Sequence, residues 1–137
     1  MKSTAIWQKG YQSVVDNGGN HSVTIDLPET KGGENKGATA FELCVMSLTG
    51  CINTIFTLLA EKMRIEFSAL KVELYAEQAQ GAPTITDVDC TLFITSKAPK
   101  EEIAKCLEKT IKICPVGVLF QQAGIEITHE IIVIQEE

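Results

Sequence analysis

Residues 37–62, GATAFELCVMSLTGCINTIFTLLAEK, form a long apolar stretch around which the rest of the chain is organised. No Asp, Glu, Lys or Arg occurs between Leu43 and Ala60. A helix that is apolar on nearly every face is normally buried at the centre of a domain. Thr39 followed by Glu42 matches a capping box, in which the hydroxyl and the carboxylate satisfy the first free backbone N–H groups. We therefore predict a long buried helix that begins at Thr39.

Length and composition limit the kinds of protein this chain can be. The 137 residues are typical of one domain, residues 1–137. The net charge of −6, without a basic stripe, argues against nucleic acid as a partner. The longest apolar run is interrupted by Thr and Asn, so we expect no membrane span, and the first residues lack the apolar region of a secretory signal. We expect a cytoplasmic protein.

The order of the predicted elements indicates the fold class. Alternating or β-branched segments predict strands at residues 3–8, 11–15, 21–27, 67–78, 84–96 and 125–134. A second helix opens at residues 98–102 and ends before Pro115, and a short helix covers 116–122. The order β-β-β-α-β-β-α-α-β predicts an α+β fold, because its helices are too few for a doubly wound sheet. The near-chargeless first helix predicts a tight homodimer that would cover it.

The chain contains an odd number of cysteines and no CxxC pair: Cys44, Cys51, Cys90, Cys106 and Cys114. In a chain without a secretory signal, this pattern indicates free thiols rather than a disulfide framework. Tetrahedral zinc is disfavoured because no two cysteines have ligand spacing and only His21 and His129 could join them. We expect no metal and no cofactor.

The cysteines have different predicted environments. Cys114 precedes Pro115 at the start of the short helix, where backbone N–H groups and the helix dipole favour a thiolate and lower its pKa. Cys51 lies in the middle of the apolar helix, where burial makes a thiol inert unless a cation or donor is nearby. For Cys51 the sequence leaves two interpretations open, a residue that only fills the core and a reactive thiol. We interpret Cys44, Cys90 and Cys106 as inert core residues.

Two motifs resemble those of a known family. Residues 32–51, GGENKGATAFELCVMSLTGC, with the following INTIFTLLAEKMRI, and residues 113–127, ICPVGVLFQQAGIEI, resemble the OsmC/Ohr family of osmotically inducible and organic hydroperoxide resistance proteins. The resemblance covers essentially the whole chain, including the order of its elements. It implies an OsmC-like fold with antiparallel sheets wrapped around a long central helix, in an intertwined homodimer.

The resemblance also implies an activity, a thiol-dependent peroxidase for organic hydroperoxides in oxidative stress defence. Cys51 falls on the peroxidatic cysteine, which attacks the peroxide as a thiolate and becomes a sulfenic acid. Cys114 falls on the resolving cysteine, which condenses with it to a disulfide. The implied partners are a second copy of the chain, an organic hydroperoxide, and a lipoyl-like or other small dithiol reductant.

The activating residues of the family are not all matched. Its active peroxidases hold an N-terminal arginine with a glutamate ten residues before the first cysteine, where this chain has Phe41. The only arginine here is Arg64. Lys9, in an N-terminal turn, and Glu42, which matches a second acidic position in a broader OsmC-like branch, are the candidate activating pair.

Three hypotheses follow from the sequence. The first is the peroxidase just described. The second is a small-molecule binding protein or thiol redox sensor on the same fold, without efficient peroxidase turnover, which the missing arginine favours. The third is a purely structural dimer with inert cysteines.

Overall fold

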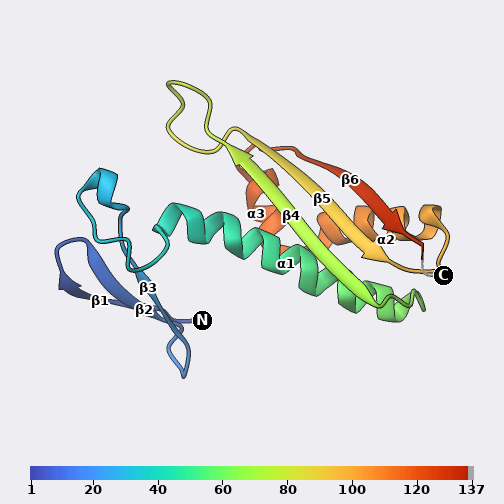
Figure 1. Ribbon diagram of the computed structural model, residues 1–137, viewed down its shortest axis with the longest axis horizontal. Coiled ribbons are helices and arrows are strands. Elements are labelled where there is room, and N and C mark those ends of the chain that lie inside the picture. The colour runs from blue at the N-terminus through green and yellow to red at the C-terminus, as the bar shows by residue number, and fades with distance from the viewer. Residues whose placement is uncertain (136–137) are drawn as a thin grey trace. The chain divides into compact units, whose positions relative to one another are not determined.

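The computed structural model describes residues 1–135 and contains the predicted order of elements. In chain order these are β1 (Thr4–Lys9), β2 (Gln12–Asp16), β3 (Ser22–Ile25), η1 (Glu29–Lys31), α1 (Ala40–Lys62), β4 (Ala69–Glu77), β5 (Asp87–Thr95), α2 (Lys100–Ile113), α3 (Pro115–Gln122) and β6 (Ile127–Ile134). The only addition to the predicted order is the single turn η1. Figure 1 shows these elements, which confirm the α+β class.

The chain forms two compact units, which divide after Cys44. The first unit is an antiparallel sheet in the order β1-β2-β3, followed by the loop that leads to α1. In this sheet Val14 of β2 lies opposite Ile6 of β1 and Thr24 of β3. Gly10, with a φ of 49°, occupies the turn between β1 and β2. The Lys9–Gly10 turn predicted from the sequence is therefore present.

The second unit contains a mixed sheet in the order β4-β5-β6. β4 and β5 are antiparallel neighbours, whereas β6 pairs with β5 in parallel, with Leu92 opposite Ile131. The prediction of purely antiparallel sheets is therefore wrong for β6. The reason is the connection: α2 and α3 lie between β5 and β6 in the chain and return it to the same end of the sheet, as a parallel pair requires.

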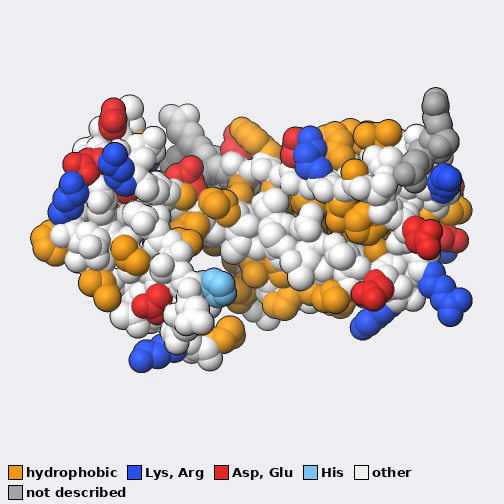
Figure 2. All heavy atoms as spheres, turned by 60° about the horizontal axis from the view of Figure 1, so that its bottom comes forward, with side chains coloured by type: hydrophobic (Ala, Val, Ile, Leu, Met, Phe, Trp, Pro, Cys, Tyr) orange, Lys and Arg blue, Asp and Glu red, His pale blue; other side chains and the backbone are white. Residues whose placement is uncertain are grey.

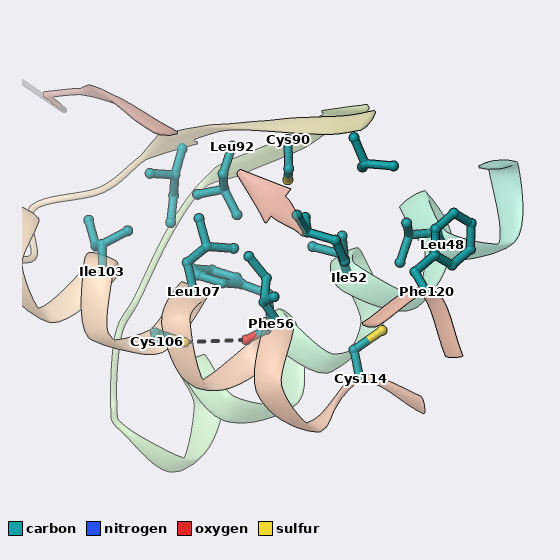
Figure 3. Packing of buried hydrophobic residues seen from close by; sticks show 14 of the residues in the cluster. Leu48, Ile52, Phe56, Cys90, Leu92, Ile103, Cys106, Leu107, Cys114 and Phe120 are labelled. Carbon is teal, nitrogen blue, oxygen red and sulfur yellow. Dashed lines mark hydrogen bonds between the residues drawn. The ribbon is translucent and has the colours of Figure 1, made fainter. Parts of the chain in front are cut away.

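The core of the second unit lies between this sheet and its helices. β5 directs Val88, Cys90, Leu92 and Ile94 to one buried face, as its alternating sequence predicts. The helix α1 contributes Leu48, Ile52, Phe56 and Ala60, which recur every four residues. From α2 come Ile103, Cys106, Leu107 and Ile111. Figure 3 shows side chains from α1, α2 and β5 meeting in this cluster.

The helix α1 is less buried in the single chain than its sequence predicts. Only one stripe of its side chains is fully buried, whereas Met46 and Leu58 are 55% and 49% exposed. Figure 2 shows hydrophobic side chains at the surface of the second unit. By length and composition alone, α1 is also long enough to cross a membrane, contrary to the expectation from its sequence. This finding is weak, because the core helix of a globular domain meets the same criterion.

Candidate functional site

Cys51 lies in the middle of α1, beside the buried stripe rather than within it. Its neighbour Ile52 is fully buried, while Cys51 is half-buried and packs against the edge of the core. One residue before it, Gly50 faces open space, since a Cβ built there would meet no atom within 4 Å. The Thr49 hydroxyl bonds to the Val45 carbonyl at 3.0 Å, along the helix itself. Cys51 therefore lies at the edge of the core, next to a helix position with open space beside it.

Cys114 occupies the junction between α2 and α3. Its backbone N–H donates to the Thr110 carbonyl at 2.8 Å and ends α2, while its side chain caps α3. The sulfur accepts a hydrogen bond from the Gly117 N–H at 3.4 Å. The N-cap position predicted from Pro115 is therefore confirmed. Figure 3 shows Cys114 at this junction, as one of the residues of the core cluster.

The fold brings Cys51 and Cys114 together, although they are distant in the sequence. Cys51 lies near enough to Cys114 to affect its pKa, and both are free thiols. Cys114 has no exposed surface. Burial and, after it, contact with Cys51 raise the pKa of Cys114 to about 11, although the N–H groups of Gly117 and Val116 act in the opposite direction. The expectation of a lowered Cys114 pKa is therefore wrong, because burial outweighs the helix terminus.

The other cysteines lie in separate environments. Cys90 on β5 and Cys106 on α2 are buried, as predicted. Burial raises the pKa of Cys90 to about 11 and also raises that of Cys106, whose thiol donates to the Phe56 carbonyl at 3.8 Å. Cys44 is exposed on α1, so its assignment to the core is wrong for the single chain. Two turns of helix separate it from Cys51.

Glu42 has the capping role that its spacing predicts. Its carboxylate accepts the Thr39 N–H at 3.0 Å, and its own N–H donates to the Thr39 hydroxyl at 3.0 Å. The backbone hydrogen bond from Thr39 holds the pKa of Glu42 below its usual value, and the charge of Lys31 contributes in the same direction. Lys31 is the cation near Glu42 that the sequence reading missed.

Lys9 lies in the first unit and has a different partner. Its ammonium group forms an ion pair with Glu34 at 3.1 Å, and Gln12 donates to the same carboxylate at 2.5 Å. The hydrogen bond from Lys9 lowers the pKa of Glu34. The Lys9–Glu34 pair is exposed at both ends, so its contribution to stability is small. Among the described residues the ion pairs do not join Lys9 to Glu42, the other candidate activating residue.

Asp26 is a buried carboxylate that the sequence reading did not single out. It accepts the backbone N–H groups of Leu27 at 2.7 Å and of Glu34 and Lys36 at 3.1 Å, together with Gln12 at 3.3 Å. Burial acts to raise its pKa, but these donors outweigh it and the pKa is lowered. The sequence feature that could have identified Asp26 is its position at the end of a strand, directly before a glycine-rich loop. Asp26 therefore fixes the loop of residues 28–37.

The described residues offer no cluster of His, Cys, Asp and Glu suited to a metal ion. His21 and His129 are both exposed. Four surface hollows are lined by residues other than these two cysteines: one lies near β2 and β3, one at the end of α1, and two beside β6. The proximity of Cys51 and Cys114 is the feature of the second unit that most clearly suggests a reaction, because two adjacent thiols can be oxidised to a disulfide with the loss of two electrons.

The sequence matches the family model described as OsmC-like protein over residues 33–130. No curated protein matches the sequence at a significant level. Among solved structures, an OsmC-like protein from Mycoplasma pneumoniae is similar with a TM-score of 0.86 and 16% identity, over 97% of this chain and 96% of that one.

Two further similar structures are organic hydroperoxide resistance proteins. The one from Legionella pneumophila has a TM-score of 0.69 and 13% identity, covering 96% of each chain. The one from Elizabethkingia anophelis, solved with crystallant-derived thiocyanate bound, has a TM-score of 0.69 and 18% identity over 98% of this chain and 94% of that chain. At these identities the likeness shows a shared fold.

Proposed function

The chain belongs to the family of OsmC-like proteins, and from this premise we propose that it is a thiol-dependent peroxidase that reduces organic hydroperoxides. The observation that carries the proposal is the contact between the Cys51 and Cys114 thiols. A pair of adjacent cysteines, one half-buried and one fully buried, suits a peroxidase cycle in which the more accessible sulfur meets the substrate.

The proposed cycle balances as follows. The Cys51 thiolate attacks the terminal oxygen of the hydroperoxide, the O–O bond breaks, and the alkoxide leaves as an alcohol after taking up a proton. Cys51 is then a sulfenic acid. The Cys114 sulfur attacks the Cys51 sulfur, and the sulfenic hydroxyl leaves as water with the Cys114 proton. An external dithiol, oxidised to its own disulfide, returns both cysteines to thiols.

Glu42 and Lys9 are the residues we propose to support thiolate formation at Cys51. In the single chain their present partners are Thr39 and Glu34. A lysine supplies positive charge, but it lacks the planar fork with which arginine grips a carboxylate and a thiolate at once. Lys9 would therefore have to exchange Glu34 for a new partner, and we expect thiolate stabilisation to be weaker than with an arginine.

We further propose that two copies of the chain pack through the exposed face of α1. Met46 and Leu58 are apolar, half-exposed and on the same helix, and Gly50 between them leaves room for close approach. Covering this face would bury Cys51 further and create an apolar pocket beside it, which suits an alkyl hydroperoxide better than hydrogen peroxide. A dimer of this kind also accounts for the apolar side chains that α1 exposes in the single chain.

The test is steady-state consumption of cumene hydroperoxide and of hydrogen peroxide with a dithiol reductant. We expect faster turnover of the alkyl hydroperoxide and complete loss of turnover in Cys51→Ser. Cys44→Ser is the matched control, because it removes a thiol from the same helix two turns away and should keep turnover. If Cys51→Ser reduces cumene hydroperoxide at the wild-type rate, the peroxidase proposal is wrong.

The second candidate function is a redox sensor or small-molecule binding protein without efficient turnover. The observation that favours it is the lack of an arginine in the N-terminal strands, where the active peroxidases of the family have one. The only arginine, Arg64, lies after the end of α1. The two functions differ in one measurable respect. A sensor would consume about one equivalent of peroxide per chain and stop even with excess dithiol, whereas a peroxidase continues until the substrate is exhausted.

A further inference from the structure

The strand β6 carries a histidine on the face that otherwise belongs to the core. His129 lies opposite Cys90 in the parallel pair of β5 and β6, and the Cys90 side chain is buried. Its neighbours on the same face of β6 are Ile127, which is buried, and Ile131, which packs against the core. Side chains of a strand alternate between its two faces, so His129 points to the same side as these isoleucines. Nevertheless, His129 is exposed. A polar side chain in an apolar series of this kind indicates a use other than core packing.

His129 lines a surface hollow of about 520 Å³ between β6 and the helices α2 and α3. The apolar lining consists of Ile111 from α2 and Ile125 and Ile127 from the segment that enters β6, all of them buried. Gly124 also lines the hollow, and a Cβ built there would meet no atom within 4 Å. Small-molecule sites have volumes of roughly 300–1,000 Å³ and combine an apolar lining with a few polar groups. This hollow therefore has the size and the lining for the apolar part of a small molecule.

The uncommitted polar groups that line the hollow are mainly hydrogen-bond acceptors. Lys112 is already paired with Glu108, at 3.2 Å. The Gln121 side-chain amide donates to the Ile111 carbonyl at 3.5 Å, which leaves its oxygen available as an acceptor. The Glu126 carboxylate forms no ion pair within the described part of the chain. With histidine counted as neutral, two carboxylates and one ammonium group leave the lining with a net negative charge.

We propose that this hollow binds a small organic amine, whose ammonium group is held by Glu126 and by acceptor atoms of Gln121 and His129. The apolar body of the amine packs on the buried isoleucines. An ammonium group has donors and no acceptor, which matches a lining whose uncommitted groups accept. A carboxylate ligand would be repelled by Glu126 and would find Lys112 already paired. The site does not include Cys51 or Cys114, and it does not depend on the proposed peroxidase activity.

The test is an NMR titration of the whole chain with phenethylamine. The matched control ligand is 3-phenylpropionate, which has the same ring and the same two-carbon spacer but the opposite charge. We expect saturable shifts of the backbone amides of Ile125, Ile127 and His129 with phenethylamine, with a Kd of about 1 mM or tighter. Binding of 3-phenylpropionate should be weaker by about fivefold or more. The absence of saturable shifts with the amine, or equal affinity for the two ligands, would overturn the proposal.

Two glutamate substitutions separate a defined site from general attraction to a negative surface. Glu126→Gln removes a charge that lines the hollow and should weaken phenethylamine binding by about fivefold. Glu130→Gln removes the same charge from the opposite face of β6, where the Thr91 hydroxyl donates to the carboxylate at 3.3 Å. The Glu130→Gln variant should bind the amine as wild type does. Equal weakening in the two variants would overturn the site.

The role of the histidine is tested by His129→Ile. Isoleucine at this position completes the apolar face of β6, so we expect the variant to unfold at a higher temperature than wild type and to bind phenethylamine more weakly. Unchanged affinity for the amine, or a lower unfolding temperature, would contradict the assignment of His129 to a binding site.

Discussion

Thr39 and Glu42 exchange two hydrogen bonds at the start of α1, each 3.0 Å long. This reciprocal arrangement satisfies two backbone N–H groups that the first helical turn leaves free. It also gives Glu42 a structural role that is independent of any effect on Cys51. The two roles can be separated by substitution, because glutamine keeps the cap and loses the charge.

We predict that Thr39→Ala lowers the free energy of unfolding by about 1 kcal/mol, because it removes the hydroxyl acceptor of the capping box. Glu42→Gln should change stability much less, since glutamine occupies the same position of a capping box. If Glu42 supports thiolate formation, Glu42→Gln will nevertheless slow peroxide turnover, and Thr39→Ala will not. Chemical denaturation and the cumene hydroperoxide assay measure the two effects. Equal loss of activity in both variants would contradict a charge-dependent role for Glu42.

The lowered pKa of Asp26 makes the stability of the fold depend on pH in a specific way. Its folded pKa is lowered, so the charged carboxylate stabilises the fold above its unfolded pKa, and this contribution is lost as the pH falls through the folded pKa. Asp26→Asn should therefore unfold at a lower temperature than wild type near pH 7, and the two melting temperatures should converge in acid. Thermal melts between pH 3 and pH 7 provide the test. A difference that is constant with pH would contradict the account of Asp26.

Two glycines in the loop before α1 are predicted to be intolerant of any side chain. A Cβ at Gly33 would lie 1.9 Å from the Leu27 carbonyl oxygen, and one at Gly37 would lie 2.1 Å from that of Thr24. Since these contacts are with backbone, the loop itself would have to move. Gly33→Ala and Gly37→Ala should each destabilise strongly, whereas the control Gly19→Ala, where a Cβ would meet only the Asn17 side-chain oxygen at 3.3 Å, should cost far less. A folded, unperturbed Gly33→Ala would show that the loop geometry is wrong.

Arg64 ends α1 in a conformation that disfavours it. Its φ is 57°, and the following N–H of Ile65 donates to the Ala60 carbonyl at 2.8 Å, which is the pattern of a helix end usually closed by glycine. We predict that Arg64→Gly raises the free energy of unfolding by about 0.5–1 kcal/mol. Arg64→Ala, which keeps the left-handed strain, should give no such gain. Denaturant titration of the two variants distinguishes the outcomes.

Much of the fold could be predicted from the sequence because its signals are local. The alternation of β5 gave its buried face, the spacing of Thr39 and Glu42 gave the start of α1, and Pro115 gave the break at Cys114. The parallel pairing of β6 was missed because strand periodicity carries no information about strand direction. Long-range relationships of this kind depend on how the connecting helices pack.

The site was only partly predictable for the same reason. The side-by-side placement of Cys51 and Cys114 was implied only by the family resemblance, since nothing in the spacing requires it. The direction of the Cys114 pKa was predicted wrongly, because the helix terminus is visible in the sequence and the burial is not. Lys9 illustrates the limit: its charge is visible, but its ion pair with Glu34 depends on how the loop folds back on β1.

The central claim is that Cys51 and Cys114 form one redox pair. The most direct test treats the reduced protein with one equivalent of cumene hydroperoxide, blocks the remaining thiols, and maps the disulfide-linked peptides by mass spectrometry. The account predicts a single linked pair that joins the peptides of Cys51 and Cys114, with Cys44, Cys90 and Cys106 recovered as free thiols. Consumption of the peroxide with Cys51 and Cys114 both still alkylatable, or with Cys51 linked to another cysteine, would contradict it.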